Sequence, residues 1–293
     1  MTLPRPTITS SANPRVKQAA RLREAGERRA TGLTLVDGSR EIGRALAAGV
    51  EIVEAFVDAE SPPDSVRDAC RDGLAARGVE LVPLARRPFE KIAFGSRNEG
   101  LVAVVRFVAQ DLEQFQPAAD HPILVVEGVE KPGNLGAILR TADAAGIAGV
   151  IACGDGTDPA NPAAIRASLG TIFSVPLAVA SSEAAIDWCA RQQRKVFAAM
   201  PNGSIVWHDA AFPGATAIVL GSEAHGLSAA WQDAAAAGRI HLHTIRLPMC
   251  GVADSLNVSA AAAILAYEAL RQSGRAALQT GPERQGGGGM RGA

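Results

Sequence analysis

The sequence has few aromatic residues, little net charge and no long apolar run. Phe, Trp and Tyr make up 4% of the 293 residues, so Ala, Gly and aliphatic side chains must fill most of the core. The formal net charge at pH 7 is −1, so the overall charge does not indicate a nucleic-acid-binding protein. No apolar run approaches the roughly 20 residues that span a bilayer, which excludes a transmembrane helix.

Cysteine is also scarce, and the four cysteines stand far apart, at positions 70, 153, 189 and 250. They show no Cys-x-x-Cys or similar metal-ligand spacing, so we interpret each as a small apolar filler in a reducing compartment and expect no metal site. The N-terminal residues lack the apolar core of a secretory signal. We therefore expect a cytoplasmic protein with no membrane association.

What the sequence does contain is an alternation of Val/Ile/Leu-rich strand patterns with helix patterns. Residues 1–112 predict a small α/β domain, and residues 123–272 predict a mostly parallel sheet with helices on both faces. Residues 113–122 are polar and contain two prolines, so they predict a linker with few contacts between the domains. We accordingly expect the second domain to fold without the first. The Gly-rich tail over residues 273–293 is expected to be disordered.

Basic side chains crowd the first predicted helix, over residues 13–29. Such a stretch can contact phosphates, but it is also typical of a solvated helix face, and both interpretations stay open. The basic residues of this stretch are Arg15, Lys17, Arg21, Arg23, Arg28 and Arg29.

A first polar segment of the second domain, Val129–Arg140, follows a predicted strand and opens a helix. Its glycines allow close backbone approach, Asn134 lies near the helix start, and Arg140 lies inside the helix. Taken alone, the segment is explained equally well by a helix cap and a surface arginine.

A second segment, Gly221–Gly226, follows the apolar residues 217–220. It offers free backbone amides and the carboxylate of Glu223 at the carboxyl edge of the predicted sheet, where open α/β sheets bind ligands. Glu223 stands where a dinucleotide fingerprint requires its middle glycine, which argues against a nicotinamide-dependent enzyme. His225 has no evident carboxylate to orient it, so we interpret it as a turn residue and not as a general base.

A third segment, Ile245–Ser259, leads into an Ala-rich helix, and Ser255 and Asn257 flank its start. Helix capping is the usual role of such residues, but it does not explain a polar Asn257 at the head of an apolar helix. The helix over residues 256–271 is apolar on more sides than one sheet face can cover. We therefore expect a homodimer.

Together, the three segments resemble the three motifs of the SpoU/TrmH family of RNA methyltransferases, which belongs to the SPOUT superfamily. They read Asn-x-Gly-x-x-x-Arg at 134–140, Gly-Ser-Glu-x-x-Gly-Leu at 221–227 and Leu-Pro-Met-x-Gly-x-x-x-Ser-Leu-Asn-Val-Ser at 247–259. The resemblance covers residues 122–272 in the family's order and spacing. Residues 11–46 are similar to the ribosomal-protein-L30e-like RNA-binding domain that precedes the catalytic domain in members acting on ribosomal RNA.

The resemblance implies an α/β fold in which a SPOUT-type parallel sheet with a deep trefoil knot follows a small L30e-like α/β domain. The methyl donor, S-adenosyl-L-methionine, would bind at the knot. The same region would form a homodimer whose active site draws on both chains. The expected donor contacts are Gly221, Ile245, Leu247, Met249 and Leu256.

The resemblance also implies methyl transfer to a ribose 2′-hydroxyl of RNA, with large-subunit ribosomal RNA favoured. A guanidinium with a pKa above about 12 is a poor proton acceptor, so we interpret Arg140 as a clamp on the substrate phosphate. Transfer RNA as the substrate, or an RNA-binding homologue without catalysis, stay open as alternatives. The matched functional positions are Asn134, Arg140, Glu223, Ser255 and Asn257, and the candidate RNA contacts of the first domain are Arg15, Lys17, Arg21 and Arg40.

One position departs from the family pattern. Many members carry Asp where this chain has Lys131. The position lies outside the residues expected to do chemistry, so we expect it to affect the conformation of the loop and not the activity.

Overall fold

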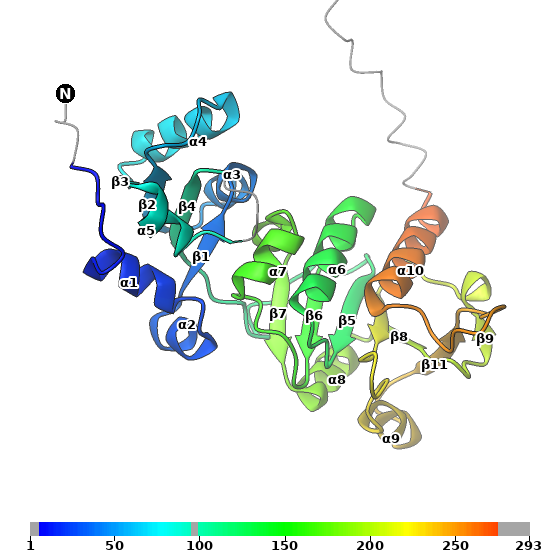
Figure 1. Cartoon of the computed structure of the whole chain (residues 1–293). Coiled ribbons are helices and arrows are strands. Elements are labelled where there is room, and N and C mark those ends of the chain that lie inside the picture. Colours follow the sequence, from blue (N-terminus) through cyan, green and yellow to red (C-terminus); the bar gives the residue numbers. More distant parts are fainter. Residues whose placement is uncertain (1–5, 95–98, 275–293) are drawn as a thin grey trace, which may run out of the picture.

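Two β-sheets, one in each half of the chain, organise the structure (Figure 1). A computed structural model describes residues 6–94 and 99–274. The tail that we expected to be disordered over residues 273–293 lies outside the described residues from position 275 onward. The alternating order of strands and helices confirms the expected α/β class.

The first domain is a small α/β unit, as expected. Its strands are β1 (Leu33–Asp37), β2 (Ile52–Asp58), β3 (Glu80–Leu84) and β4 (Leu101–Arg106). Its helices are α1 (Pro14–Arg21), α2 (Ala25–Thr31), α3 (Ser39–Ala47), α4 (Ser65–Ala76) and α5 (Arg86–Glu90). The strand order is β1-β4-β2-β3; β4 pairs antiparallel with β1 and β2, and β2 pairs parallel with β3.

The prediction of a single helix over residues 13–29 is wrong, because the chain divides there into α1 and α2. Glu24, between the two helices, is extended, with φ −85° and ψ 130°. The guanidinium of Arg28 donates hydrogen bonds to the carbonyls of Leu22 at 3.0 Å and Arg23 at 2.8 Å. Carbonyls at a helix end lack partners within the helix, so these bonds stabilise the break.

The second sheet is larger, and every strand pair found in the described residues is parallel. Its strands are β5 (Ile123–Glu127), β6 (Val150–Cys153), β7 (Leu177–Ala180), β8 (Lys195–Ala199), β9 (Ile205–Val206), β10 (Thr216–Leu220) and β11 (Leu242–Arg246). Its helices are α6 (Pro132–Ala145), α7 (Pro162–Ala167), α8 (Ser182–Arg191), α9 (Ala230–Ala236) and α10 (Val258–Gln272), with short 3₁₀ turns η1 (Thr171–Phe173) and η2 (Trp207–Asp209). The expected parallel sheet is confirmed, although the sequence did not predict the short strand β9.

Both faces of this second sheet bury apolar side chains. In β5, Leu124 and Val126 join the core beneath α6 and α10, whereas Ile123 and Val125 join the core beneath α8 and α9. Figure 1 shows α6, α7 and α10 on one face of the sheet and α8 and α9 on the other. Because the faces are covered, a binding site has to form at the ends of the strands.

The strand order β7-β6-β5-β10-β8-β11-β9 contains a switch point between β5 and β10. From β5 the chain crosses to β6 and β7 on one side, while β8 and β11 lie on the other side of β10. At such a switch point the loops diverge, which opens a crevice at the carboxyl ends of the strands. Val126 of β5 and Leu220 of β10 are paired at this edge.

The prediction that few contacts cross between the two domains is wrong. Arg28 of α2 forms an ion pair at 2.8 Å with Asp158, which follows β6, and the arginine side chain is only 3% exposed. Arg166 of α7 lies 3.1 Å from the buried carboxylate of Asp37 at the end of β1. One hydrophobic core also contains side chains of α3 and β4 together with side chains of α6 and α10. The two domains therefore share a buried interface.

The segment over residues 113–122, predicted to be a linker, packs against the second sheet. Phe115 is 2% exposed, and its ring centroid lies 5.3 Å from that of Trp188 in α8. Removal of residues 1–112 would leave the carboxylate partner of Arg28 without its cation and would uncover part of a shared core. We therefore replace the expectation that the second domain folds alone with the opposite one.

Substitution of Arg28 by Met should lower the free energy of unfolding by about 2–3 kcal/mol, because it leaves a partly buried carboxylate and two carbonyls without their donor. Arg29→Met is the matched control, since Arg29 is the exposed neighbour in the same helix. The control should change the free energy of unfolding by less than about 0.5 kcal/mol. Urea unfolding measures both, and equal stability of the two variants would show that the interface pair contributes nothing.

Candidate active site

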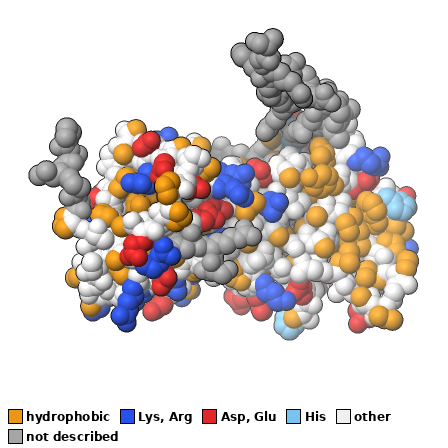
Figure 2. All heavy atoms as spheres, turned by 45° about the horizontal axis from the view of Figure 1, so that its top comes forward, with side chains coloured by type: hydrophobic (Ala, Val, Ile, Leu, Met, Phe, Trp, Pro, Cys, Tyr) orange, Lys and Arg blue, Asp and Glu red, His pale blue; other side chains and the backbone are white. Residues whose placement is uncertain are grey.

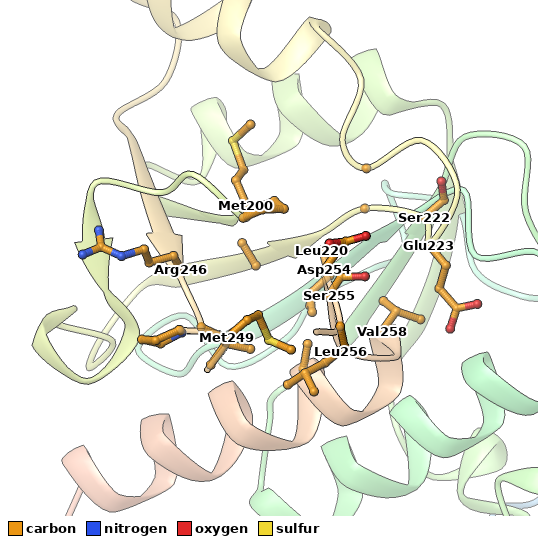
Figure 3. Close-up of a pocket in the computed structure, with 18 of the residues that line it drawn as sticks. Met200, Leu220, Ser222, Glu223, Arg246, Met249, Asp254, Ser255, Leu256 and Val258 are labelled. Atoms are coloured by element: carbon orange, nitrogen blue, oxygen red, sulfur yellow. The ribbon is translucent and has the colours of Figure 1, made fainter. Parts of the chain in front are cut away.

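A pocket of about 770 Å³ lies at the carboxyl edge of the second sheet (Figure 3). Its walls come from the ends of β8, β10 and β11 and from the start of α10. Glu223 and Ser255, two of the predicted functional residues, line it. Ile245, a predicted cofactor contact, does not line it, because its side chain is buried in the core at 1% exposure. The other predicted cofactor contacts all line the pocket: Gly221, Leu247, Met249 and Leu256.

Two glycines permit the close backbone packing from which the pocket is built. A Cβ on Gly221 would lie 2.1 Å from the carbonyl carbon of Gly226, and a Cβ on Gly203 would lie 2.3 Å from that of Ile245. These contacts are too close for any side chain, so both positions require glycine. Ser222 and Gly226 exchange two backbone hydrogen bonds of 3.0 Å, which close the loop after β10.

The carboxylate of Glu223 joins three segments that are far apart in the sequence. Its Oε2 accepts a hydrogen bond from the ammonium of Lys131 at 2.6 Å. Its Oε1 accepts hydrogen bonds from the side-chain amides of Asn134 at 3.2 Å and Asn257 at 2.5 Å. The amide of Asn257 also donates to Oδ1 of Asn134 at 3.1 Å. These four residues, Lys131, Asn134, Glu223 and Asn257, are called the Glu223 cluster below.

Asn257 has two roles at once, because it also caps α10. Its Oδ1 accepts hydrogen bonds from the backbone N–H of Ser259 at 2.9 Å and from the hydroxyl of the same residue at 2.6 Å. The Nδ2 of the same side chain donates a hydrogen bond to Glu223. Asn257 therefore caps α10 and also belongs to the Glu223 cluster, and these two sets of contacts explain a polar residue at the head of an apolar helix. Its part in the reaction stays a prediction.

The Glu223 cluster holds a fixed pair of charges. The hydrogen bond from Lys131 is the largest cause that lowers the pKa of Glu223 below its usual value, and the amide of Asn134 and the backbone N–H of Val258 add to it. The same bond raises the pKa of Lys131. Glu223 is therefore ionised, and Lys131 protonated, at neutral pH.

A smaller pocket, of about 230 Å³, opens beside the Glu223 cluster. It shares Ser222, Glu223 and Val258 with the larger pocket. The loop between β5 and α6, with Lys131, and the first turn of α6, with Asn134, supply most of its remaining wall. In Figure 3 the carboxylate of Glu223 lies at the margin of the larger pocket, so the cluster borders both cavities.

Arg140 is a predicted functional residue that lies apart from the cluster. It is exposed on α6, six residues after Asn134. At about 100° and 1.5 Å per residue, it is turned about 240° around the helix and displaced about 9 Å along it. Within one chain, Arg140 and Asn134 therefore face different directions.

The four candidate RNA contacts in the first domain differ in their surroundings. The guanidinium of Arg15 is held by two carboxylates, at 2.5 and 2.7 Å, and that of Arg21 pairs with Glu27 at 2.7 Å. Lys17 and Arg40 are exposed. Contact with RNA stays a prediction for all four, and Arg15 would have to leave its carboxylates to make it.

The sequence analysis missed the part that Lys131 plays in this site. It placed Lys131 outside the residues expected to do chemistry, whereas the structure brings its ammonium directly onto Glu223. One signal was present, namely a cation three residues before Asn134. Nothing in the sequence, however, links Lys131 to a carboxylate 92 residues away until β5 and β10 are known to be neighbours.

Among the described residues, the side chains that could bind a metal ion or act as a nucleophile form no comparable cluster. Across residues 6–94 and 99–274, no group of three His, Cys, Asp or Glu side chains is arranged to hold a metal ion. Burial raises the pKa of the Cys153 thiol to about 12, so it stays protonated and unreactive. The helices in these two ranges are all too short or too polar to cross a membrane.

Comparison with known families and proteins gives matches to both domains. The model for the SpoU rRNA methylase family matches residues 121–267, and the model for an MRM3-like substrate binding domain matches residues 13–103. The chain is 31% identical over 280 residues to the 23S rRNA (uridine(2479)-2′-O)-methyltransferase of Streptomyces viridochromogenes, covering 92% of this chain and 94% of that protein. It is 28% identical over 261 residues to the 23S rRNA (guanosine(2553)-2′-O)-methyltransferase of Bacillus subtilis, covering 89% and 97%.

Solved structures resemble the chain over nearly its whole length. The crystal structure of an RNA 2′-O ribose methyltransferase has a TM-score of 0.80 and 39% identity, covering 92% of this chain and 99% of that one. An AdoMet-bound rRNA methyltransferase from Sinorhizobium meliloti has a TM-score of 0.79 and 27% identity, covering 91% and 97%. Both structural similarities therefore extend over the two domains of this chain.

Gly221→Ala should lower the free energy of unfolding by about 2–3 kcal/mol, because the added Cβ meets backbone atoms that cannot move aside cheaply. Gly251→Ala is the matched control: it lines the same pocket, and its Cβ would meet nothing within 4 Å. We expect the control to stay within about 0.5 kcal/mol of the parent protein. Thermal and urea unfolding would decide, and a tolerated Gly221→Ala would disprove the tight packing of this loop.

Proposed function

We propose that this chain, which belongs to the SpoU rRNA methylase family, transfers a methyl group from S-adenosyl-L-methionine to a ribose 2′-hydroxyl of ribosomal RNA. The observation that carries this proposal is the Glu223 cluster, which borders a pocket at the carboxyl edge of a parallel sheet. The two relatives named above are, by name, 2′-O-methyltransferases of 23S rRNA. Large-subunit ribosomal RNA is therefore the proposed substrate class.

The larger pocket is the proposed site of the methyl donor. Its volume of about 770 Å³ suits a small-molecule ligand. Its walls combine apolar side chains such as Met249 and Leu256 with backbone groups around Gly221, and the carboxylate of Asp254 favours a cationic ligand. S-adenosyl-L-methionine would supply a sulfonium methyl group, whose departure leaves a neutral thioether. The residues present fit that donor.

The acceptor ribose is proposed to meet the Glu223 cluster from the smaller pocket. The ribose hydroxyl loses its proton to solvent water as its oxygen attacks the methyl carbon, so positive groups near the developing alkoxide lower the barrier. Arg140 is proposed as such a group, since a guanidinium cannot take the proton but can clamp the neighbouring phosphate. Asn134 and Glu223 would hold the surrounding loops, and Ser255 would help to align ribose and donor.

The proposed active unit is a homodimer. Within one chain Arg140 is turned away from Asn134, so a second chain is needed to bring an Arg140 side chain to the cluster. Figure 2 shows hydrophobic side chains gathered at the end of the molecule formed by the second domain, where a second copy would bury them. The trefoil knot implied by the family resemblance stays a prediction. The exposed large apolar residues of this end are Met249, Val252, Leu256 and Tyr267.

The alternatives raised by the sequence are less well supported. A homologue that binds RNA without catalysis need not keep the functional positions, yet all five are present and three of them are hydrogen-bonded together. Transfer RNA as the substrate is favoured by no feature of the described residues. The cytoplasmic location expected from the sequence also stays a prediction.

The direct test is to map 2′-O-methylated nucleotides in RNA from cells with and without this protein, and to repeat the reaction with purified protein, methyl-labelled donor and either 23S rRNA or transfer RNA. We expect at least one large-subunit position to lose its methyl group in the cells without the protein. We also expect label to enter 23S rRNA but not transfer RNA. Failure of the purified protein to bind the donor by calorimetry would reject the proposed activity.

Arg140→Ala should reduce methyl transfer by more than about tenfold, a loss of at least about 1.4 kcal/mol of transition-state stabilisation. Donor affinity and thermal stability should not change, because Arg140 is exposed and lies outside the donor pocket. Arg191→Ala is the matched control, since Arg191 ends α8 on the opposite face of the sheet. Turnover with 23S rRNA measures the effect, and near-normal turnover of Arg140→Ala would refute the assigned role.

Light scattering should report a mass of about 60 kDa, twice the 30.2 kDa of one chain. Tyr267→Glu should shift this mass toward that of one chain, because it places a charge on the exposed apolar side of α10. Val66→Glu is the matched control, since Val66 is an exposed apolar residue on α4 of the first domain. A monomeric parent protein at micromolar concentration would contradict the dimer.

A further inference from the structure

Lys131 occupies a helix position at which a lysine is energetically unfavourable. It is the N-cap residue of α6, and its side chain makes no capping hydrogen bond. Ser, Thr, Asp and Asn are the residues that stabilise an N-cap, and a cation is unfavourable beside the positive end of the helix dipole. Helix stability therefore does not explain a lysine at this position, and the explanation has to lie in a contact elsewhere.

That contact is Glu223. The carboxylate of Glu223 accepts hydrogen bonds from Lys131, from the amides of Asn134 and Asn257, and from the backbone N–H of Val258. Of these donors, Lys131 carries the charge, and it is bonded to Oε2 alone. The Lys131 side chain is 71% exposed, so the pair adds little to stability in water.

The two carboxylate oxygens of Glu223 have different partners, and this sets the orientation of the carboxylate. While Lys131 holds Oε2, Oε1 stays turned toward the amides of Asn134 and Asn257. Without the ammonium, only neutral donors hold the carboxylate, so its orientation and the acceptor that it offers to the two amides are less tightly fixed. Catalysis is sensitive to displacements of this size, since a 1 Å misplacement can reduce a rate about a hundredfold.

We propose that Lys131 is a positioning residue for methyl transfer: its ammonium fixes the carboxylate of Glu223 and thereby the side-chain amides of Asn134 and Asn257. This inference rests on the proposed function. It makes Lys131 a residue whose removal disturbs the reaction while leaving the fold intact.

The proposal has a pH signature. The ammonium of Lys131 is the largest cause of the lowered pKa of Glu223, so its loss should raise that pKa. The site needs the ionised carboxylate, and the acidic limb of the kcat profile should therefore move to higher pH when Lys131 is replaced. Three other titratable side chains lie on the segments that meet at Glu223. They are Glu130 before α6, His225 in the loop that carries Glu223, and Asp254 before α10.

The test compares Lys131→Met, Lys131→Arg and Lys131→Asp with the parent protein. The aspartate variant is the sharpest, because it supplies a good N-cap to α6 while placing a like charge beside Glu223. Lys195→Met is the matched control, since Lys195 is exposed at the start of β8, the strand end opposite the site. The measurements are thermal stability, kcat and KM for 23S rRNA between acidic and neutral pH, and the salt dependence of RNA affinity.

We expect Lys131→Met to lower kcat by about tenfold to a hundredfold and to move its acidic limb upward. Lys131→Arg should restore most of the rate, and Lys131→Asp should be at least as stable as the parent yet lose more activity than Lys131→Met. An unchanged kcat and pH profile would overturn the proposal. A raised KM with a weaker salt dependence and an unshifted acidic limb would also overturn it, since Lys131 would then be a phosphate contact.

A measurement without turnover separates this inference from the proposed function. The ¹³C carboxyl resonance of Glu223, assigned with Glu223→Gln, should titrate at higher pH in Lys131→Met than in the parent. If the parent protein transfers no methyl group, the proposed function fails whatever the titration shows. If methyl transfer is found but the Glu223 titration is the same in both proteins, the inference about Lys131 fails by itself.

Discussion

The parallel pairing of β5 with β10 is the constraint on which the site depends. The register aligns Ile123 with Ala217 and Val126 with Leu220, so both strands end at the same height on the same edge of the sheet. The loop after β5 leads into the first turn of α6, which carries Asn134, and the loop after β10 carries Glu223. The two side chains meet at 3.2 Å. A shift of either strand by two residues would move its loop by about 7 Å and separate the pair.

The third part of the site depends on the start of α10. Asn257 is fixed there because it caps the helix, and the same amide then donates to Glu223 and Asn134. The N-terminus of a helix also favours a nearby negative charge, and the N–H of Val258 donates to the Glu223 carboxylate. The side-chain amide of Asn257 therefore caps α10 and also connects Glu223 with Asn134.

The first domain is connected to this site by the segment between β6 and α7. Thr157 of that segment donates its backbone N–H to the carbonyl of Val129 at 2.8 Å, in the loop that also carries Lys131. The next residue, Asp158, is the partner of Arg28 in the first domain. The two domains are thus joined by polar contacts close to the loop that carries Lys131 as well as by a shared core. A composition-based linker assignment could not show this, because it describes only the chain between the domains.

The sequence by itself determined the alternation of strands and helices, the parallel second sheet and the three motif segments. These features are local, since periodicity, capping residues and motif spacing are written in adjacent residues. Tertiary structure alone decided which positions meet. It placed Lys131 on Glu223, left Arg140 facing elsewhere, buried Ile245 in the core and locked the two domains together through Arg28. The physical reason is that contacts between residues 90 or more positions apart depend on strand order and register, which one sequence read along its length does not specify.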